Sequence, residues 1–381
     1  MMYKLIDLFA GAGGLTTGFH LAGFDSLCAI DRDAKALATY QHNYPNTKVI
    51  NQDIRLVNPS ELRSWLNLQR EELSVMIGGP PCQGFSKNVP AGERNLNDSR
   101  NQLYKTFLEF VQEFRPICVV IENVSEILKA YEGVVKNEIT KQLELLGYKV
   151  VSASLNAANY GIPQTRTRAF FVASLNQLPD LPQQTHYQNK INCTTTNPYC
   201  SQLNLFEPSI SSIVTVRDAI GDLPPLDAGQ EYIGEGYPSV PQSRYQSIIR
   251  TKSTKIVNHI ARALSPIQTA RVRLLKEGQD ARDLPSELAP KKHYSGAYGR
   301  LYWDQPARTI TRWVFHPGSG RFFHPTQNRT ITIREAARLH SYPDNFHFLG
   351  TYTHMASQIG ESVPPLLAKA IANSLLPDYP Q

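Results

Sequence analysis

The amino-acid sequence predicts an α/β fold with a mostly parallel sheet, joined to a second, smaller and irregular domain. Short apolar runs alternate with helically spaced segments up to about residue 176, and this periodic pattern then stops. The length of 381 residues also suits two domains. We therefore expect residues 1–176 and 355–381 to form one domain and residues 177–354 to form the other.

The first apolar run, residues 3–10, has a β-branched residue and two aromatics, and it ends at a glycine-rich turn. Residues 15–22 then read as the start of a helix. A second run ends at Asp31, and residues 34–43 follow it with helical spacing. Further strands are expected at residues 48–51, 73–79, 117–123, 148–155 and 169–175, and further helices at residues 101–114 and 134–147.

The later part of the chain is less regular. Residues 178–242 are rich in Pro, Gln, Asn, Thr and Gly, which indicates a polar loop or insertion. Basic residues follow, and residues 299–315 then form a β-like stretch rich in Arg and aromatic residues. Helices are expected at residues 332–340, before Pro343, and after the Pro pair near the C-terminus.

Composition narrows the function classes. There are 39 Lys and Arg against 33 Asp and Glu, a net charge of +6, which permits an anionic partner such as nucleic acid without requiring one. Five Cys do not make a disulfide scaffold. No apolar run reaches the roughly 20 residues of a membrane span, and the N-terminus does not resemble a signal peptide. We therefore expect a cytoplasmic globular protein.

A glycine-rich turn follows the first strand in the motif Asp7-Leu-Phe-Ala-Gly-Ala-Gly-Gly, where backbone can approach a ligand closely. Thr16 replaces the third glycine of the dinucleotide fingerprint, and no P-loop motif is present, so neither NAD nor ATP is predicted. Asp31 could bind ribose hydroxyls, and Asp53 could accept from an adenine amino group. The alternative is a tight structural turn with two surface acids.

A single thiol stands in an unusual loop. Cys82 lies in Gly-Gly-Pro-Pro-Cys-Gln-Gly-Phe-Ser, residues 78–86, directly after an apolar run. Such a loop suits an exposed nucleophile better than a core residue. Cys28 and Cys118, by contrast, read as buried small apolar residues.

A carboxylate and two guanidinium groups are expected at the same edge of the sheet. Glu122 ends a buried apolar run, which favours a raised pKa and a role as a general acid. Arg166 and Arg168 lie two residues apart in an extended segment and could hold a carboxylate and a substrate carbonyl. The alternative is a salt bridge at the strand edge without chemistry.

The order of these motifs resembles the DNA cytosine-5 methyltransferases, in the form found in bacterial modification systems. The matching runs are DLFAGAGG, Asp31, QDI, GGPPCQGFS, ENV, QTRTR, TIREAARLHSYPDNF and QIGESVPPLLAKAI. They cover nearly the whole chain except residues 176–300. The resemblance implies the class I methyltransferase fold, S-adenosylmethionine as cofactor, and a cytosine flipped out of double-stranded DNA.

The resemblance also implies roles for single residues. Cys82 would add to C6 of cytosine, Glu122 would hold or protonate N3, and Arg168, supported by Arg166, would bind the ring carbonyl and orient the acid. The implied cofactor pocket consists of Phe9, Gly11, Ala12, Gly13, Gly14, Leu15, Asp31, Asp53, Ile54, Pro80, Leu103, Ser362 and Val363.

DNA contacts are expected from two places. Gln83 and Ser86 would lie on the loop that closes over the flipped base. The segment between QTRTR and the TIREAARL helix would carry target recognition, with contacts from Arg300, Arg308, Thr311, Arg312 and Arg321. For each of these arginines, a solvated surface charge is the alternative.

Some positions depart from the family pattern or suggest packing. Glu361 stands where the family often has Asn, and Arg32 stands where an apolar residue often flanks the adenine. Arg334 and Glu335 are expected to form a structural pair between the domains. Three histidines, His316, His324 and His340, are expected to pack or form hydrogen bonds rather than bind ligands.

Two other functions remain as alternatives. A cytosine-5 methyltransferase acting on tRNA would typically carry a Cys-Phe-Thr tripeptide, which is absent. A non-catalytic DNA-binding protein on this scaffold would have lost its nucleophile or acid, but Cys82 and Glu122 are both present. We therefore predict a DNA cytosine-5 methyltransferase of a restriction–modification system. It is expected to act as a monomer on DNA in the bacterial nucleoid, without metal or membrane. A restriction endonuclease is a possible functional partner, and the sequence does not show whether one exists.

Overall fold

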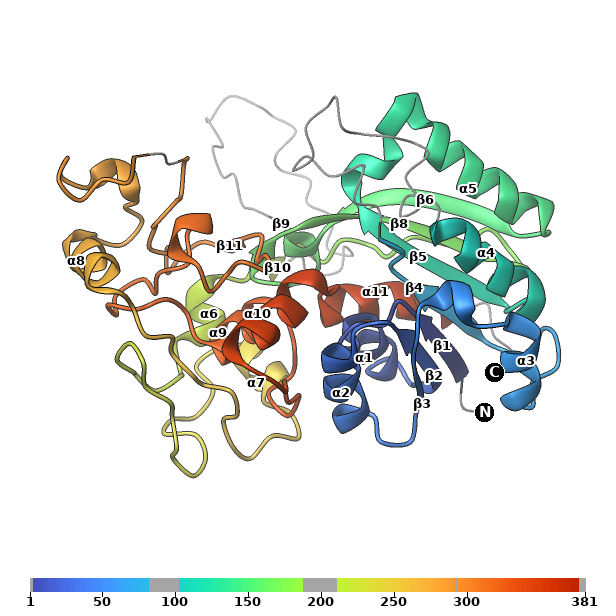
Figure 1. Ribbon diagram of the computed structural model, residues 1–381, viewed down its shortest axis with the longest axis horizontal. Helices are drawn as coiled ribbons and strands as arrows, with labels where there is room; N and C mark the ends of the chain where they lie inside the picture. The colour runs from blue at the N-terminus through green and yellow to red at the C-terminus, as the bar shows by residue number, and fades with distance from the viewer. Residues whose placement is uncertain (1–2, 82–102, 188–210, 292–293, 377–381) are drawn as a thin grey trace, which may run out of the picture.

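The computed structural model describes residues 3–81, 103–187, 211–291 and 294–376. Figure 1 shows a lobe built on a sheet and a second lobe of short helices and loops, which contains α6 to α9. Among the described residues, no helix is long and apolar enough to cross a membrane. The same residues contain no cluster of His, Cys, Asp and Glu suited to a metal ion.

The first lobe contains a seven-stranded sheet in the order β3-β2-β1-β4-β5-β8-β6. All neighbours pair in parallel except β8, which is antiparallel to β5 and to β6. The short link between β6 and β8 explains the reversal, because a parallel crossover needs a dozen or more residues. The predicted mostly parallel α/β sheet is confirmed. Its strands are β1 Tyr3–Leu8, β2 Phe24–Asp31, β3 Lys48–Asn51, β4 Val75–Gly78, β5 Cys118–Val124, β6 Lys149–Asn156 and β8 Thr167–Ser174.

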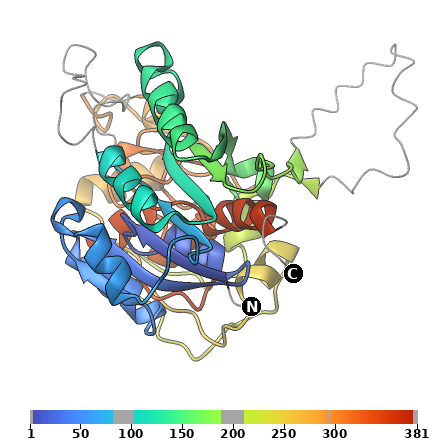
Figure 2. The ribbon, with the colours of Figure 1, turned by 90° about the vertical axis from the view of Figure 1, so that its right-hand side faces the viewer.

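Helices cover both faces of the sheet, because successive strand residues point to opposite sides. Ile6 of β1 packs in one core with Phe107 and Ile139, whereas its neighbour Leu5 packs in another core with Phe19 and Ile371. Figure 2 shows α11 on the opposite side of the sheet from α4 and α5. The helices of this lobe are α1 Gly14–His20, α2 Ala34–Asn43, α3 Pro59–Trp65, α4 Leu103–Phe114, α5 Val134–Leu145 and α11 Pro365–Leu375.

The second lobe has little regular structure but its own apolar core, which includes Tyr245, Leu339, Tyr342 and Met355. Its helices are α6 Val216–Ile220, α7 Arg244–Ile249, α8 Pro266–Leu274, α9 Ile333–Leu339 and α10 Tyr352–Glu361. Two-residue strands pair as β7 Gln164–Thr165 with β11 Ala307–Arg308, and β9 His186–Tyr187 with β10 Ser211–Ser212. Within the described ranges, the 3-10 turns are η1 Ile54–Leu56, η5 Ser125–Leu128, η6 Ala130–Gly133, η7 Ala157–Tyr160, η9 Ala281–Asp283 and η10 Pro317–Ser319.

Two predictions need adjustment here. Of the β-like residues 299–315, only β11 is a strand. Arg300 instead donates to loop carbonyls, and Ile310 donates to the side chain of Gln164. The predicted domain boundary at residue 355 falls inside α10, whose apolar residues belong to the second core. The division into two domains stays a prediction.

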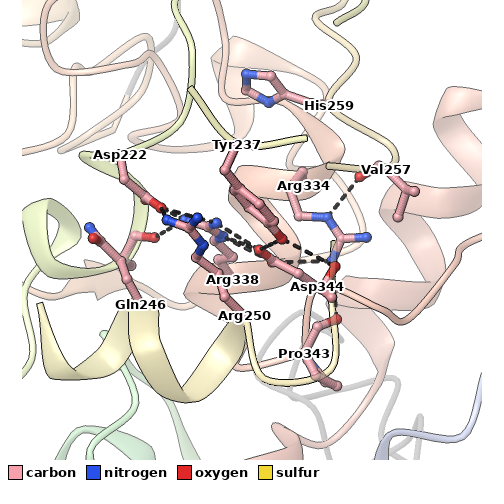
Figure 3. Close-up of polar contacts among 12 residues, drawn as sticks. Asp222, Tyr237, Gln246, Arg250, Val257, His259, Arg334, Arg338, Pro343 and Asp344 are labelled. Atoms are coloured by element: carbon pink, nitrogen blue, oxygen red, sulfur yellow. Dashed lines mark hydrogen bonds and ion pairs between the residues drawn. The ribbon is translucent and has the colours of Figure 1, made fainter. Parts of the chain in front are cut away.

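A buried ionic network holds the second lobe around α9 (Figure 3). Both carboxylates that face Arg338 are fully buried, and its guanidinium donates to Asp344 at 2.6 Å and to Asp222 at 2.5 Å. Arg250 adds a second partner for Asp222 at 3.2 Å, and Tyr237 donates to Asp344 at 2.7 Å. The network ties residues far apart in sequence to one helix.

The expected pairing of Arg334 with Glu335 is wrong. Neighbouring residues of a helix do not face each other. Glu335 accepts instead from Arg329, at 2.7 and 2.8 Å. Arg334 donates to the carbonyls of Val257 and Phe346, so both side chains are still structural.

Replacing Arg338 by Met is expected to lower the free energy of unfolding by about 3–5 kcal/mol, because two buried carboxylates lose their main partner. Urea unfolding measures this change. Arg217→Met is the matched control, since its ion pair with Asp304 is largely exposed and is worth about 1 kcal/mol or less. Equal losses in the two variants would contradict the assignment.

Candidate active site

A cavity of about 980 Å³ opens where β1, β2, β4 and β5 end. The carboxyl ends of parallel strands meet at one edge of a sheet, which is where α/β proteins bind ligands. Thr311, Arg312 and residues at the end of α10 also line the cavity. All the residues predicted for the cofactor line this cavity except Gly13, whose Cα faces the ring of Tyr40.

One end of the cavity is built from the glycine turn and Asp31. The backbone N–H of Gly11 donates to one carboxylate oxygen of Asp31, and that of Asp33 donates to the other, both at 2.8 Å. Burial raises the pKa of Asp31, and these two N–H groups partly oppose that shift. Each carboxylate oxygen can accept two hydrogen bonds, so Asp31 is fixed in place and can still accept from a ligand hydroxyl.

Asp53 and Arg32 lie at the same end. The guanidinium of Arg55 donates to both carboxylate oxygens of Asp53, at 2.9 and 2.6 Å, and lowers the pKa of this acid to about 2. Asp53 is therefore a carboxylate at any physiological pH, although its nearest partner is a neighbouring arginine. Arg32 lines the cavity as an exposed residue, as expected for a position without an apolar side chain.

A buried acid supports the glycine turn from below. Asp7 is fully buried and accepts from the hydroxyl of Thr16 at 2.7 Å, and Thr16 in turn contacts the hydroxyl of Tyr40 at 2.9 Å. The other Asp7 oxygen has no hydrogen-bond partner within the described part of the chain. Thr16, which departs from the dinucleotide fingerprint, thus has a structural partner. Burial raises the pKa of Asp7 to about 7, and the Thr16 hydrogen bond opposes part of that shift.

This acid should make stability depend on pH. Between its ordinary pKa of 3.8 and about 7, the folded chain holds a proton on Asp7 that the unfolded chain releases. The stabilisation present below this range is therefore lost as the pH rises to about 7. As the pH rises from about 5 to about 8, the free energy of unfolding measured in urea is expected to fall less in Asp7→Asn than in the wild type. Asp227→Asn, at an exposed position, should follow the wild type, and an unchanged slope in Asp7→Asn would refute the prediction.

The other end of the cavity holds the predicted acid. Glu122 lies at the end of β5, and the Nε of Arg168 is 3.0 Å from its Oε1. A Cβ on Gly79 would lie 3.0 Å from the other carboxylate oxygen, so glycine leaves room for the acid. Burial raises the pKa of Glu122, while the charges of Arg168 and Arg166 lower it in part. This environment suits a carboxyl group that gives and takes a proton.

Arg166 lines the same cavity as Arg168, and its role as support for Arg168 stays a prediction. Its guanidinium is buried and donates to the carbonyls of Ile310, Gly360 and Ser362 at 2.9 to 3.0 Å. No ion pair between Arg166 and Glu122 occurs among the described residues, and the two interact only through their charges. The Nε of Arg166 is buried and has no hydrogen-bond partner among the described residues, and Arg166 is one of the residues that line the cavity. Arg166 therefore acts mainly on backbone.

The loop with the predicted nucleophile begins at the same end. Pro80 and Pro81 line the cavity, and the amide of Asn123 donates to the Pro80 carbonyl at 2.9 Å. Sequence reasoning gave no role to Asn123, although the ENV motif contains it. The predicted residues Cys82, Gln83 and Ser86 lie outside the described residues.

The arginines predicted to contact DNA divide into two groups. Arg308 and Arg312 are exposed, and Thr311 and Arg312 line the cavity. Arg300 and Arg321 are only 3% and 6% exposed. The Arg300 guanidinium donates to carbonyls such as those of Leu275 and His324, and Arg321 pairs with Asp280 at 3.0 Å. Their burial argues against the predicted DNA contacts and assigns both to holding loops together.

Comparison with known proteins gives consistent matches along the chain. A model of the family described as C-5 cytosine-specific DNA methylase matches residues 3–376. The type II methyltransferase M.AgeI of Thalassovita gelatinovora is 35% identical over 98% of this chain and 99% of its own length. M.DdeI of Desulfomicrobium norvegicum is 34% identical over 98% of this chain and 88% of its own.

Solved structures give the same picture. A protein described as a DNA modification methyltransferase encoded within an E. coli prophage matches with a TM-score of 0.73 and 29% identity over 98% of both chains. A Dnmt2 methyltransferase of S. pombe matches with a TM-score of 0.57 but only 18% identity, so this likeness concerns the fold alone.

Proposed function

The chain belongs to the C-5 cytosine-specific DNA methylase family and is a DNA cytosine-5 methyltransferase, and from this we propose that its cavity receives S-adenosylmethionine at the Asp31 end and a flipped cytosine at the Glu122 end. One observation carries the proposal. A held carboxylate on a glycine turn and a buried acid paired with an arginine line the same cavity. Two ligands that must exchange a group need such a shared space.

The residues at the Asp31 end fit the cofactor. Asp31 offers acceptors for ribose hydroxyls, and Ile54 and Leu103 offer an apolar wall for the adenine. A Cβ on Gly14 would lie 2.5 Å from the Val363 carbonyl oxygen. Only a glycine at this position therefore lets the turn at Val363 pack directly against the glycine turn. When bound, S-adenosylmethionine supplies a methyl group on a positively charged sulfur.

At the other end, the proposed chemistry makes C5 of cytosine nucleophilic. The Cys82 thiolate adds to C6, the electron pair of the C5–C6 bond shifts through the ring toward N3, and Glu122 gives N3 a proton. Arg168 orients the acid and donates to the ring carbonyl. C5 then bonds to the methyl group as the bond between that methyl and the cofactor sulfur breaks, and N3 returns its proton to Glu122. Loss of the C5 proton to a base restores the C5–C6 double bond and expels the Cys82 thiolate.

We further propose that the chain is the modification enzyme of a restriction–modification system. The support is the names of its relatives, which are type II methyltransferases that match almost end to end. In this proposal it acts in the cytoplasm as a monomer on double-stranded DNA, without a metal ion. A restriction endonuclease would be its functional partner, and the exposed Arg308 and Arg312 would contact DNA phosphates, Arg312 from the lining of the cavity.

Bisulfite sequencing of plasmid DNA from cells that express the chain tests the function. The expected result is methylated cytosine confined to one short sequence, which also identifies the target. Unmethylated plasmid with soluble protein would contradict the proposal. In that case bisulfite sequencing of total tRNA separates the RNA alternative from an inactive DNA-binding scaffold.

A further inference from the structure

Two segments far apart in sequence meet across the mouth of the cavity. Residues 309–312 form the recognition-side segment, and residues 360–363 form the cofactor-side turn, and members of both line the cavity. A Cβ on Gly360 would lie 2.1 Å from the backbone nitrogen of Arg312 and 2.1 Å from the carbonyl carbon of Thr311. The two backbones are therefore in direct contact, and neither can move far without the other.

Buried polar groups fasten this contact from the inside. Arg166 donates to Ile310 of the segment and to Gly360 and Ser362 of the turn, so one guanidinium bridges both backbones. The side chain of Gln164 accepts from the Ile310 N–H at 2.8 Å. His340 contacts the Ser362 carbonyl at 3.0 Å. The bridge therefore starts from the strand end that also carries Arg168.

An ion pair fastens the same contact from the outside. Arg312 lies 2.9 Å from Glu361, and both side chains are about half exposed, at 52% and 53%. The second carboxylate oxygen of Glu361 accepts from Ser357 at 3.1 Å, which holds it in position at the end of α10.

We propose that Glu361 is a positioning residue that, through Arg312 and together with the Arg166 bridge, makes cofactor binding and DNA binding cooperative. The inference rests on the proposed function. A ligand at the Asp31 end orders the turn at Ser362 and Val363, and the turn orders the segment that DNA contacts. Such coupling is reciprocal, so each ligand strengthens binding of the other by the same factor.

The test measures that factor directly. Calorimetry gives the Kd of S-adenosylhomocysteine with and without a saturating duplex of the mapped target sequence, and the ratio is the coupling factor. Glu361→Gln and Arg312→Gln are each expected to reduce the factor about two- to fivefold, the range for an exposed pair. The double variant should lose no more than either single variant, because both remove the same contact.

Two further variants sharpen the result. Arg308→Gln, an exposed arginine near the segment, should weaken DNA binding but leave the coupling factor unchanged. Arg166→Lys, whose single ammonium cannot reach three carbonyls, should reduce the factor more than Glu361→Gln does. Thermal melting checks that Arg166→Lys is folded. If this variant is unfolded, the Glu361→Gln and Arg312→Gln variants still test the proposal, because both of these side chains are exposed.

The outcomes separate the inference from the function. If the wild type methylates its target but has a coupling factor of one, or if Glu361→Gln leaves that factor unchanged, the inference is wrong and the function stands. Additive losses in the double variant would also overturn it. If the wild type methylates no DNA, the proposed function itself has failed.

Discussion

Replacing Glu122 by Gln is expected to slow methylation by about 10²–10⁴-fold, the range for loss of a general acid–base group. The amide keeps the size and polarity of the side chain, but it cannot give a proton to N3 of cytosine. Arg168 would also lose the charge that holds it at 3.0 Å. Single-turnover transfer of a radiolabelled methyl group to the mapped duplex measures the rate of the chemical step.

Duplex binding should survive this substitution, because Glu122 lies inside the cavity rather than at its rim. Glu109→Gln is the matched control, since it is an exposed glutamate on α4 that does not line the cavity. It should leave the rate unchanged. A Glu122→Gln rate within a factor of about three of the wild type would remove Glu122 from the proton transfer.

The pH dependence of the rate gives an independent check. Burial raises the pKa of Glu122 above its ordinary value, although Arg168 and Arg166 oppose part of the shift. The fraction of enzyme with a protonated acid therefore falls as the pH rises through this raised pKa, and the rate should fall with it. Glu122→Gln has no such proton, so this limb of the profile should disappear in the variant.

The sequence was most informative where chemistry and strand order coincide. Asp31 and Glu122 each follow a short apolar run, and parallel strands bring the ends of such runs to one edge. Their place in a common cavity could therefore be predicted without coordinates. The Arg168 ion pair with Glu122 also follows from strand pairing, because Val124 lies opposite Arg168 in the sheet.

Contacts between segments far apart in the chain could not be predicted from the sequence. Arg166 has the same residue type and spacing as Arg168, yet it bonds to backbone carbonyls from two other parts of the chain. The periodicity of apolar residues does not indicate where a backbone carbonyl that lacks a hydrogen-bond partner will lie. The wrong prediction for Arg300 has the same cause. A basic residue in an irregular segment is expected to be exposed, but here loops fold over Arg300 and bury it.

Some missed elements did leave a signal. α8 begins with Ser265, Pro266 and, two residues later, Gln268, and the structure has the full capping box between Ser265 and Gln268. Thr215 and Asp218 do the same for α6. These caps mark helix starts, but helices this short have too few turns for apolar spacing to be recognised.

Replacing Cys82 by Ser is expected to reduce methylation below detection. A serine hydroxyl remains protonated near neutral pH and is a far weaker nucleophile than a thiolate, so C6 of cytosine would not be attacked. Without that bond C5 stays part of an aromatic ring, and neither Glu122 nor Arg168 can make it nucleophilic alone. Plasmid from cells expressing Cys82→Ser should therefore show no methylation above vector DNA. The control is Cys193→Ser, which changes a cysteine of the polar segment 178–242 and should match the wild type.

A trapping experiment separates a lost nucleophile from a lost fold. With 5-fluorocytosine at the target position, C5 carries no proton that a base could remove, so the Cys82–C6 bond cannot break by the normal route. The wild type incubated with this duplex and S-adenosylmethionine should run as a covalent complex on a denaturing gel, and Cys82→Ser should bind the duplex but form no such complex. A covalent complex in the Ser variant would mean that another residue attacks C6. Pro81, which directly precedes Cys82 in the chain, lines the same cavity as Glu122, so the chemistry would then have to be reassigned within that cavity.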